Sequence, residues 1–154
     1  MSALMQANFH IRPMLLADLP SVLTIEEEAH ISPWTQGIFQ DCLRVGYQCH
    51  VLEQHAIIKA YGILSVAVQE AHILNLCVCK ASRQQGLGRI LLHHLIDQAK
   101  QQHADTMFLE VRPSNVAALA LYDALGFDQL DIRVDYYPTD FGGREDALIL
   151  AKAL

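Results

Sequence analysis

Two glycines, Gly86 and Gly88, lie between a polar cluster and a leucine-rich run in the stretch KASRQQGLGRILLHHL. Glycines before a helix allow the backbone to come close to a bound group, because no Cβ atom intervenes. The first turn of the helix adds unpaired N–H groups and the positive end of its dipole, and Arg83 and Arg89 add charge. The stretch therefore has the chemistry of an anion site, and a glycine-rich turn into an ordinary helix is the open alternative.

Two familiar phosphate-binding patterns do not fit this stretch. A Walker loop requires a lysine and a hydroxyl residue directly after its second glycine, and neither follows Gly88. A dinucleotide fingerprint requires a third glycine at the position of Leu91. What remains is the pattern R-x-x-G-x-G between a strand and a helix.

The cysteines offer a second kind of chemistry, which their spacing does not support. Cys77 and Cys79 form the sequence CVC in a strand-like run, where alternation places both on one face. A zinc site requires C-x-x-C spacing and a second paired cluster. Cys42 and Cys49 do not supply one, so we expect four structural free thiols and no metal.

The loop must be positioned by a mixed sheet. Hydrophobic alternation predicts strands over residues 8–14, 48–53, 56–68, 71–79, 105–112, 127–137 and 145–154. Periodicity and capping residues predict helices over residues 15–30, 32–45, 86–102 and 114–127. The expected caps are Asp18 for the first helix, Ser32 or Thr35 for the second, where Pro33 suits a first turn, and Ser114 or Asn115 for the last. A run of hairpins followed by a β-α-β unit indicates an α/β (α+β) fold with helices on both faces of the sheet.

Length and charge limit the classes of function. A chain of 154 residues suits a single domain, residues 1–154. The net charge of −6 disfavours nucleic acid as the main partner and suits a basic protein or an amine. We expect a cytoplasmic protein, because the start MSALMQANFHIRP does not read as a signal peptide and no run reaches the ~18 apolar residues of a membrane span. The sequence carries no signal for an oligomeric state.

Several blocks together resemble one family. RQQGLGRILL resembles the acetyl-CoA pyrophosphate loop of the GCN5-related N-acetyltransferases, the GNAT superfamily, and HILNLCV resembles the strand that pairs with the pantetheine arm. LEVRPSNVAALALYDALGF resembles the next block of that family. The stretches AHISPWTQGIF and IRVDYYPTDFGGREDALIL resemble the RimI branch, whose members acetylate the N-terminal alanine of ribosomal protein eighteen of the small subunit.

The resemblance implies a fold and a cofactor site. The GNAT fold is a mixed, mostly antiparallel twisted sheet of six to seven strands flanked by about four helices. Acetyl-CoA is the implied cosubstrate, with direct transfer in a ternary complex and no acyl-cysteine. The implied cofactor contacts are the pantetheine-binding backbone of Leu76, Cys77 and Val78, and the pyrophosphate-binding backbone of Gln84, Gln85, Gly86, Leu87, Gly88 and Arg89.

Glu110 and Tyr122 are the candidates for acid–base chemistry. Glu110 is the only acid in TMFLEVR, and its alternation partner Phe108 suggests a partly buried face, where desolvation would raise the carboxyl pKa toward a range useful for a base. It matches the position of the base in the RimI branch, acting directly or through a water. Tyr122 matches the general acid of the family, and Asn115, two helical turns earlier, is placed to bind a pantetheine amide. A structural salt bridge for Glu110 and simple core packing for Tyr122 are the alternatives.

Three aromatic residues are candidates for the acceptor side. Trp34, Tyr136 and Tyr137 lie where the family places its peptide-facing loops, although ordinary packing explains them equally well. Val134 and Asp135 depart from the RimI pattern, in which a second Arg and an Asn are common, and TDFGGR is one residue longer. An N-acetyltransferase of a small amine, or a module that binds acyl-CoA without catalysis, therefore remain as alternatives to a protein N-terminal acetyltransferase.

Overall fold

The computed structural model describes residues 8–154, which form one sheet of seven strands in the order β1-β2-β3-β4-β5-β7-β6. All neighbouring strands are antiparallel except β4 and β5, which are parallel. The mixed sheet expected from the sequence is confirmed, with seven strands. These are β1 (Phe9–Pro13), β2 (Gln48–Gln54), β3 (Ile57–Ala67), β4 (Glu70–Val78), β5 (Thr106–Val111), β6 (Asp128–Pro138) and β7 (Arg144–Ala153).

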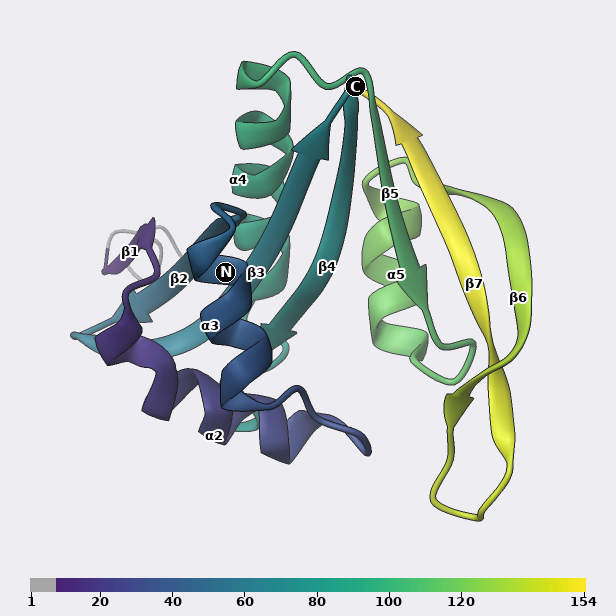
Figure 1. The fold of residues 1–154 in the computed structure, drawn as a ribbon, viewed down its shortest axis with the longest axis horizontal. Helices are drawn as coiled ribbons and strands as arrows, with labels where there is room; N and C mark the ends of the chain where they lie inside the picture. Colours follow the sequence, from purple (N-terminus) through teal and green to yellow (C-terminus); the bar gives the residue numbers. More distant parts are fainter. Residues whose placement is uncertain (1–7) are drawn as a thin grey trace.

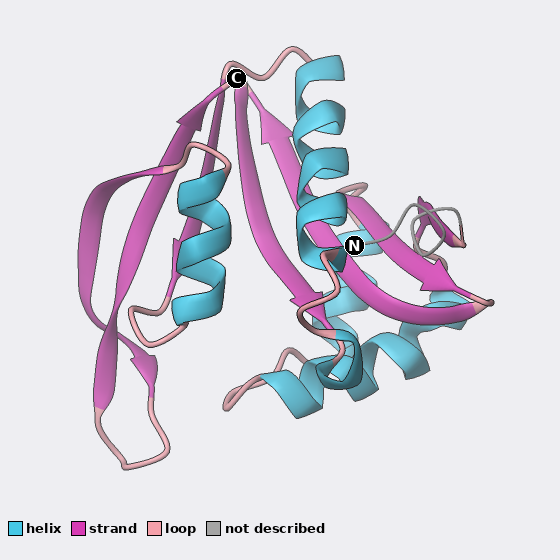
Figure 2. Ribbon diagram, turned by 180° about the vertical axis from the view of Figure 1, so that it is seen from behind, coloured by secondary structure: helices cyan, strands magenta, loops and turns pink. Residues whose placement is uncertain are grey.

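Helices lie on both faces of this sheet. Figure 1 shows α2 and α3 in front of the first strands, and Figure 2 shows α4 and α5 on the opposite face. No helix formed by residues 8–154 has the length and apolar character needed to cross a bilayer. The helices are α2 (Leu19–Ala29), α3 (Gln36–Arg44), α4 (Leu87–Gln101) and α5 (Val116–Ala124), with the 3-10 turns η1 (Leu16–Asp18) and η2 (Lys80–Ser82).

The parallel strands β4 and β5 stay together for only part of their length. Their register covers Glu70–Thr106, Ala71–Met107 and His72–Phe108, after which the strands separate (Figure 1). Just beyond this point the register between β3 and β4 slips by one residue at Leu74. Such a bulge bends the strand that carries it and increases its local twist. We call the gap between the separated strands the fork.

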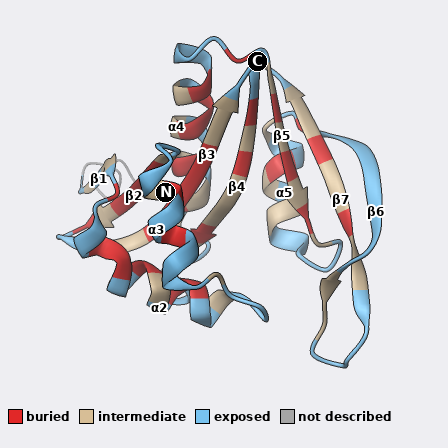
Figure 3. Ribbon diagram, in the orientation of Figure 1, coloured by how far each residue is buried: buried red, intermediate tan, exposed pale blue. Residues whose placement is uncertain are grey.

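The core is divided between the two faces of the sheet (Figure 3). On one face, α4 buries an apolar stripe of Leu87, Leu91, Leu95 and Ile96, together with the neighbouring Leu92. Its close approach to β3 depends on Gly62, where a Cβ atom would lie 2.7 Å from Leu95 Cδ1.

On the other face, α2 and α3 cover a cluster against which both Cys77 and Cys79 pack, as the alternation predicts. All four cysteines are free thiols.

The expected caps are present, but two helix starts differ in detail from the prediction. Asp18 occupies the N-cap position of α2, and its side chain makes no hydrogen bond to that helix. The carboxylate accepts hydrogen bonds from both terminal nitrogens of Arg12, at 2.7 and 2.8 Å, and from Leu15 N at 2.7 Å. The second helix starts at Gln36, capped by Thr35 rather than Ser32, so Pro33 lies before it.

Candidate active site

The fork opens into a cavity of about 470 Å³ that most of the predicted chemistry lines. Its walls come from β4, β5, α5, β6 and the loop between α2 and α3. The predicted base, the predicted acid and all three acceptor-side aromatics therefore meet in one place. The predicted site residues that line the cavity are Trp34, Leu76, Glu110, Asn115, Tyr122, Tyr136 and Tyr137.

The remaining cofactor candidates lie outside the walls of this cavity. The Cys77 side chain is buried in the cluster under α2 and α3, so only its backbone is left for a ligand. The start of α4 lies beside Val78 and α5. A Cβ atom built on Gly88 would lie 3.5 Å from Val78 Cγ2 and 3.6 Å from Leu121 Cδ2. These are ordinary van der Waals distances, so the space at Gly88 does not itself require glycine.

The N-terminus of α4 has the properties of an anion site. Gly86 stands at its N-cap with φ 79°, a left-handed conformation that favours glycine. No side chain caps this helix, whereas Thr35 caps α3 and Asn115 caps α5. The unpaired N–H groups of the first turn, aligned with the helix dipole, therefore remain free for a phosphate group. This arrangement fits the pyrophosphate of acetyl-CoA.

Glu110 is held by two basic side chains. Its Oε1 atom lies 3.4 Å from His72 Nε2 of β4 and 3.9 Å from Arg133 Nη2 of β6. Hydrogen bonding by His72 lowers the carboxyl pKa, and the charges of His72 and Arg133 lower it further against the opposing effect of burial. The predicted rise in pKa is therefore wrong, because the sequence did not show that these partners face Glu110 and outweigh desolvation.

Tyr122 is buried, with 7% of its surface exposed, and its ring packs edge-on against Phe127 at 5.5 Å. Burial raises the phenol pKa, as do the neighbouring Tyr137 and Cys77, so the hydroxyl is protonated at neutral pH. No residue in the described range 8–154 forms a hydrogen bond with that hydroxyl. The phenol is thus a proton donor without a protein acceptor.

Asn115 has a structural task as well as a place in the cavity. Its Oδ1 atom accepts a hydrogen bond from Ala118 N at 3.2 Å and so caps α5. Ser114, the other predicted cap, donates to Glu145 Oε1 at 2.8 Å instead. With Oδ1 engaged, the Nδ2 group of Asn115 is the part of this side chain left to donate to a ligand.

The acceptor-side aromatics are each fixed by a neighbour. The guanidinium carbon of Arg112 lies 4.4 Å from the centre of the Tyr137 ring, and Tyr136 packs edge-on against Tyr137 at 4.9 Å. Burial and the nearby Glu110 raise the pKa of Tyr137 to about 12. The Trp34 ring packs on Phe39 at 5.2 Å. We call Trp34, Tyr136 and Tyr137, which all line the cavity, the aromatic wall.

Glu26 also lines the cavity, and the sequence analysis missed it. Only 2% of this residue is exposed, and its carboxylate accepts hydrogen bonds from Tyr61 Oη, Asn75 Nδ2 (2.8 Å) and Trp34 N (2.9 Å). It therefore joins α2 to the sheet and to the Trp34 loop. Glu26 belongs to the acidic run EEEA, and such a run is usually exposed to solvent. It follows buried Val22 by four residues, however, and this spacing places both side chains on the same, inner face of α2.

The β6 strand is irregular where the sequence departs from the family pattern. Its register with β7 shifts between Arg133 and Tyr137, and Asp135 adopts a left-handed φ of 52°. The Asp135 N–H donates to Asp146 Oδ1 at 3.0 Å. Asn and Asp both tolerate a left-handed conformation. The replacement of the family's Asn by Asp135 therefore does not require a different backbone at this position.

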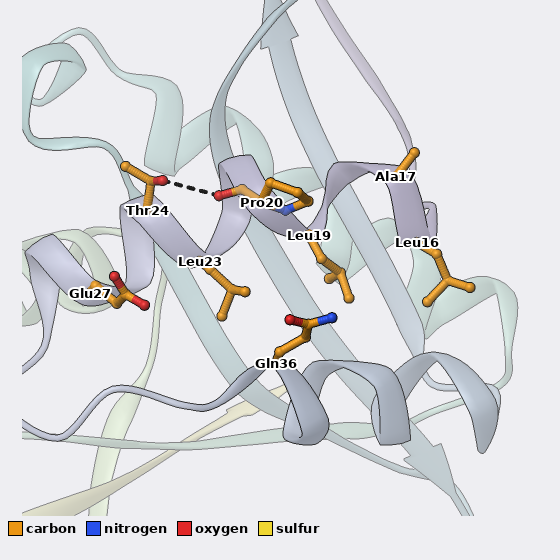
Figure 4. Close-up of a pocket in the computed structure, with 8 residues that line it drawn as sticks. All are labelled: Leu16, Ala17, Leu19, Pro20, Leu23, Thr24, Glu27 and Gln36. Atoms are coloured by element: carbon orange, nitrogen blue, oxygen red, sulfur yellow. Dashed lines mark hydrogen bonds between the residues drawn. The ribbon is translucent and has the colours of Figure 1, made fainter.

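A second hollow, of about 460 Å³, lies between η1, α2 and the start of α3 (Figure 4). Both apolar and polar residues line it, among them three leucines, and the Thr24 hydroxyl donates to Pro20 O at 3.0 Å. None of the predicted site residues lines this hollow. The fork cavity is therefore the better candidate for the active site.

Comparison with known proteins gives consistent matches over most of the chain. A model of the acetyltransferase (GNAT) family matches residues 13–127. The [ribosomal protein bS18]-alanine N-acetyltransferase of Escherichia coli strain K12 is 44% identical over 134 residues, covering 87% of this chain and 90% of that protein. The protein of the same description from Haemophilus ducreyi is 38% identical over 142 residues, with 92% and 97% covered. The crystal structure of the ribosomal-protein-S18-alanine N-acetyltransferase from Escherichia coli superposes with a TM-score of 0.88 at 41% identity, covering 94% of this chain and 93% of that one.

Proposed function

The chain belongs to the GNAT acetyltransferase family, and from this premise we propose that it transfers the acetyl group of acetyl-CoA to the N-terminal alanine of ribosomal protein bS18. The observation that carries the proposal is the fork cavity, which brings Glu110, Tyr122 and the acceptor-side aromatics together. The relatives that act on bS18 match this chain over nearly its whole length. Because a ribosomal protein is the substrate, we place the enzyme in the cytoplasm.

Glu110 is the proposed proton acceptor. An α-ammonium group, whose pKa is about 8, has no lone pair at neutral pH and must lose a proton before it attacks a carbonyl. The lowered pKa keeps Glu110 ionised, so its carboxylate attracts the ammonium group and accepts the proton directly or through a water.

Tyr122 is the proposed proton donor. Acetyl-CoA supplies a thioester, whose acetyl group is open to attack by the neutral amine. The Tyr122 hydroxyl holds its proton at neutral pH and has no protein acceptor among the described residues. It is therefore suited to donate that proton to the departing thiolate sulfur, which stabilises the charge that develops there.

The two substrates are proposed to bind on different sides of the cavity. The N-terminus of α4 is proposed to bind the pyrophosphate, and the backbone of Leu76, Cys77 and Val78 along the open edge of β4 to bind the pantetheine arm, with Asn115 donating to one of its amides. Trp34, Tyr136 and Tyr137 are proposed to form the slot for the peptide N-terminus.

One assay tests the proposal. Purified enzyme receives acetyl-CoA with a peptide that copies the bS18 N-terminus, with the same peptide already acetylated, or with a panel of polyamines and aminoglycosides. Released CoA and peptide mass are then measured. We expect a gain of one acetyl group on the free peptide alone. Turnover restricted to the small amines would replace the proposal with a small-amine acetyltransferase, and acetyl-CoA binding without any turnover would replace it with a binding module.

A further inference from the structure

We propose that His72 is a positioning residue for Glu110, holding one oxygen of its carboxylate at the start of the fork so that the other oxygen is free to accept the proton of the amine. This inference rests on the proposed function, because it assigns Glu110 the role of base. His72 was not among the residues that the sequence singled out. Three features of the structure support it.

The first feature is the place of His72 in the sheet. His72 pairs with Ser65 of β3 on one side and with Phe108 of β5 on the other, and it is the last residue of β4 that pairs with β5. Glu110 lies two residues after Phe108, so alternation places both side chains on the same face as His72. A side chain on a doubly paired strand is held more precisely than one on a loop.

The second feature is the contact itself. His72 Nε2 is shielded from solvent and forms no hydrogen bond of regular geometry within residues 8–154. It lies 3.4 Å from Glu110 Oε1, within ion-pair distance. An imidazole N–H, whether neutral or charged, can donate across this contact. Hydrogen bonds of catalytic groups are often long before substrate binds and shorten in the complex.

The third feature is that both basic neighbours approach the carboxylate at the same oxygen. Oε1 is the Glu110 oxygen nearest to His72 Nε2, at 3.4 Å, and nearest to Arg133 Nη2, at 3.9 Å. With Oε1 facing the two basic groups, we assign to Oε2 the new O–H bond, which forms while the N–H bond of the ammonium breaks and its electron pair stays on nitrogen. Arg133 is about half exposed and more distant, so water weakens its hold.

Other charged groups also face Glu110 and must be kept constant in any test. Tyr137 and Arg133 approach it from β6, Arg112 follows it on β5, and Glu26 lines the same cavity from α2. On β7 its register partner is the apolar Ile149. A change at His72 alone leaves these groups in place, so the effect on Glu110 can be attributed to the imidazole.

Two variants test the proposal. His72→Leu removes the donor and keeps a similar volume, and His72→Gln returns an uncharged N–H donor near the position of Nε2. With acetyl-CoA and the bS18 peptide, we expect His72→Leu to lower kcat about 10- to 100-fold, as for a misplaced catalytic group, with little change in either KM. His72→Gln should recover most of kcat. Carbon-13 NMR titration of the Glu110 carboxyl should show a higher pKa in His72→Leu than in the unchanged enzyme.

Each contrary outcome is decisive. Unchanged kcat in His72→Leu would refute the proposal, whatever the titration shows. A His72→Gln variant as slow as His72→Leu would show that the ring shape, and not the donor, is needed. If the unchanged enzyme fails to acetylate the peptide, the proposed function fails first. The titration needs no substrate and then tests the contact between His72 and Glu110 by itself. An equal Glu110 pKa in the two proteins would refute that contact, and a higher pKa in His72→Leu would support it.

Discussion

His72 of β4 and Phe108 of β5 are the last partners in the only parallel strand pair of the described sheet, and the cavity opens directly beyond them. Past this pair, each strand keeps its outer neighbour, β3 or β7, and has one unpaired edge. Unpaired N–H and C=O groups on such an edge must find other partners. The fork therefore leaves a strip of unpaired backbone on β4 and places Glu110 beside its start.

The first prediction concerns Glu110. Glu110→Gln keeps the shape of the side chain but removes its charge and its ability to accept a proton, so kcat should fall about 10²- to 10⁴-fold. The affinity for acetyl-CoA, measured by calorimetry, should stay the same because the change lies on the acceptor side of the fork. The matched control is Glu70→Gln at the exposed start of β4, which should be as active as the unchanged enzyme. Normal turnover in Glu110→Gln would remove Glu110 from the chemistry.

The second prediction separates the hydroxyl of Tyr122 from its ring. Tyr122→Phe keeps the contact with Phe127 and loses only the O–H group, which has no hydrogen-bond partner within residues 8–154. Thermal stability and the KM for acetyl-CoA should therefore be unchanged, while kcat falls about 10²-fold or more through loss of the general acid. A stable variant with full kcat would assign Tyr122 to core packing alone.

Local patterns were sufficient for the strands, the helices and the anion-binding character of the loop at Gly86. Alternation in β5 and the seven-residue spacing of Asn115 and Tyr122 are properties of single elements, and the structure places these side chains in one cavity. The resemblance to the family supplied the acceptor-side aromatics and the roles proposed for Glu110 and Tyr122.

What the sequence could not predict depends on contacts between distant segments. The Glu110 pKa is set by His72 and Arg133, which lie 38 and 23 positions away in the chain, and no local pattern joins them. Asp18 looked like a helix cap because Arg12 was not known to face it. The partners of Glu26 are likewise distant in the chain, since Tyr61 and Asn75 lie on other elements.

The third prediction concerns Asp18 and acid stability. Asp18→Asn removes a bidentate charged pair with Arg12 and should lower the free energy of unfolding at neutral pH by about 1.5–3 kcal/mol. Hydrogen bonding by Arg12 lowers the Asp18 pKa below its ordinary 3.8, so this stabilisation is present above 3.8 and is lost as the pH falls through the folded-state value. Urea unfolding of both proteins at several pH values measures the difference.

The control for this prediction is an exposed ion pair. Asp41→Asn breaks the pair with Arg44, whose side chains are 69% and 72% exposed, and should change stability by less than about 1 kcal/mol. The free energy of unfolding should differ less between Asp18→Asn and the unchanged protein in strong acid than at neutral pH. An equal difference at both pH values would contradict the assignment to the charged pair.

The fourth prediction concerns the two glycines of the loop. An alanine at Gly86 must adopt a left-handed conformation, which costs roughly 1–2 kcal/mol. If the backbone shifts to avoid this cost, the N–H groups of the α4 N-terminus move, and the affinity for CoA should fall several-fold in calorimetry. Gly88→Ala, inside the helix and with ordinary contacts around its Cβ, should keep full stability. If the two variants are equally stable, the left-handed φ of Gly86 does not require glycine.

The fifth prediction concerns Arg112, which connects the end of β5 to the β6–β7 hairpin. It donates to Pro138 O at 2.7 Å and to Glu145 Oε1 at 3.0 Å while its guanidinium covers the Tyr137 ring. Hydrogen bonds from Ser114 and Arg112 lower the Glu145 pKa, so the network is fully charged at neutral pH. These contacts hold the aromatic wall against the mouth of the fork.

Arg112→Gln should therefore loosen the acceptor side and leave the cofactor side intact. We expect the KM for the bS18 peptide to rise about ten-fold, a loss of roughly 1.4 kcal/mol of binding, with the KM for acetyl-CoA unchanged. Initial rates with each substrate varied at saturating levels of the other measure the two constants. Asp140→Asn, an exposed change in the same hairpin, should leave both unchanged. An equal rise in both constants for Arg112→Gln would mean that the whole fork depends on Arg112, and an unchanged peptide KM would mean that the hairpin does not bind the peptide.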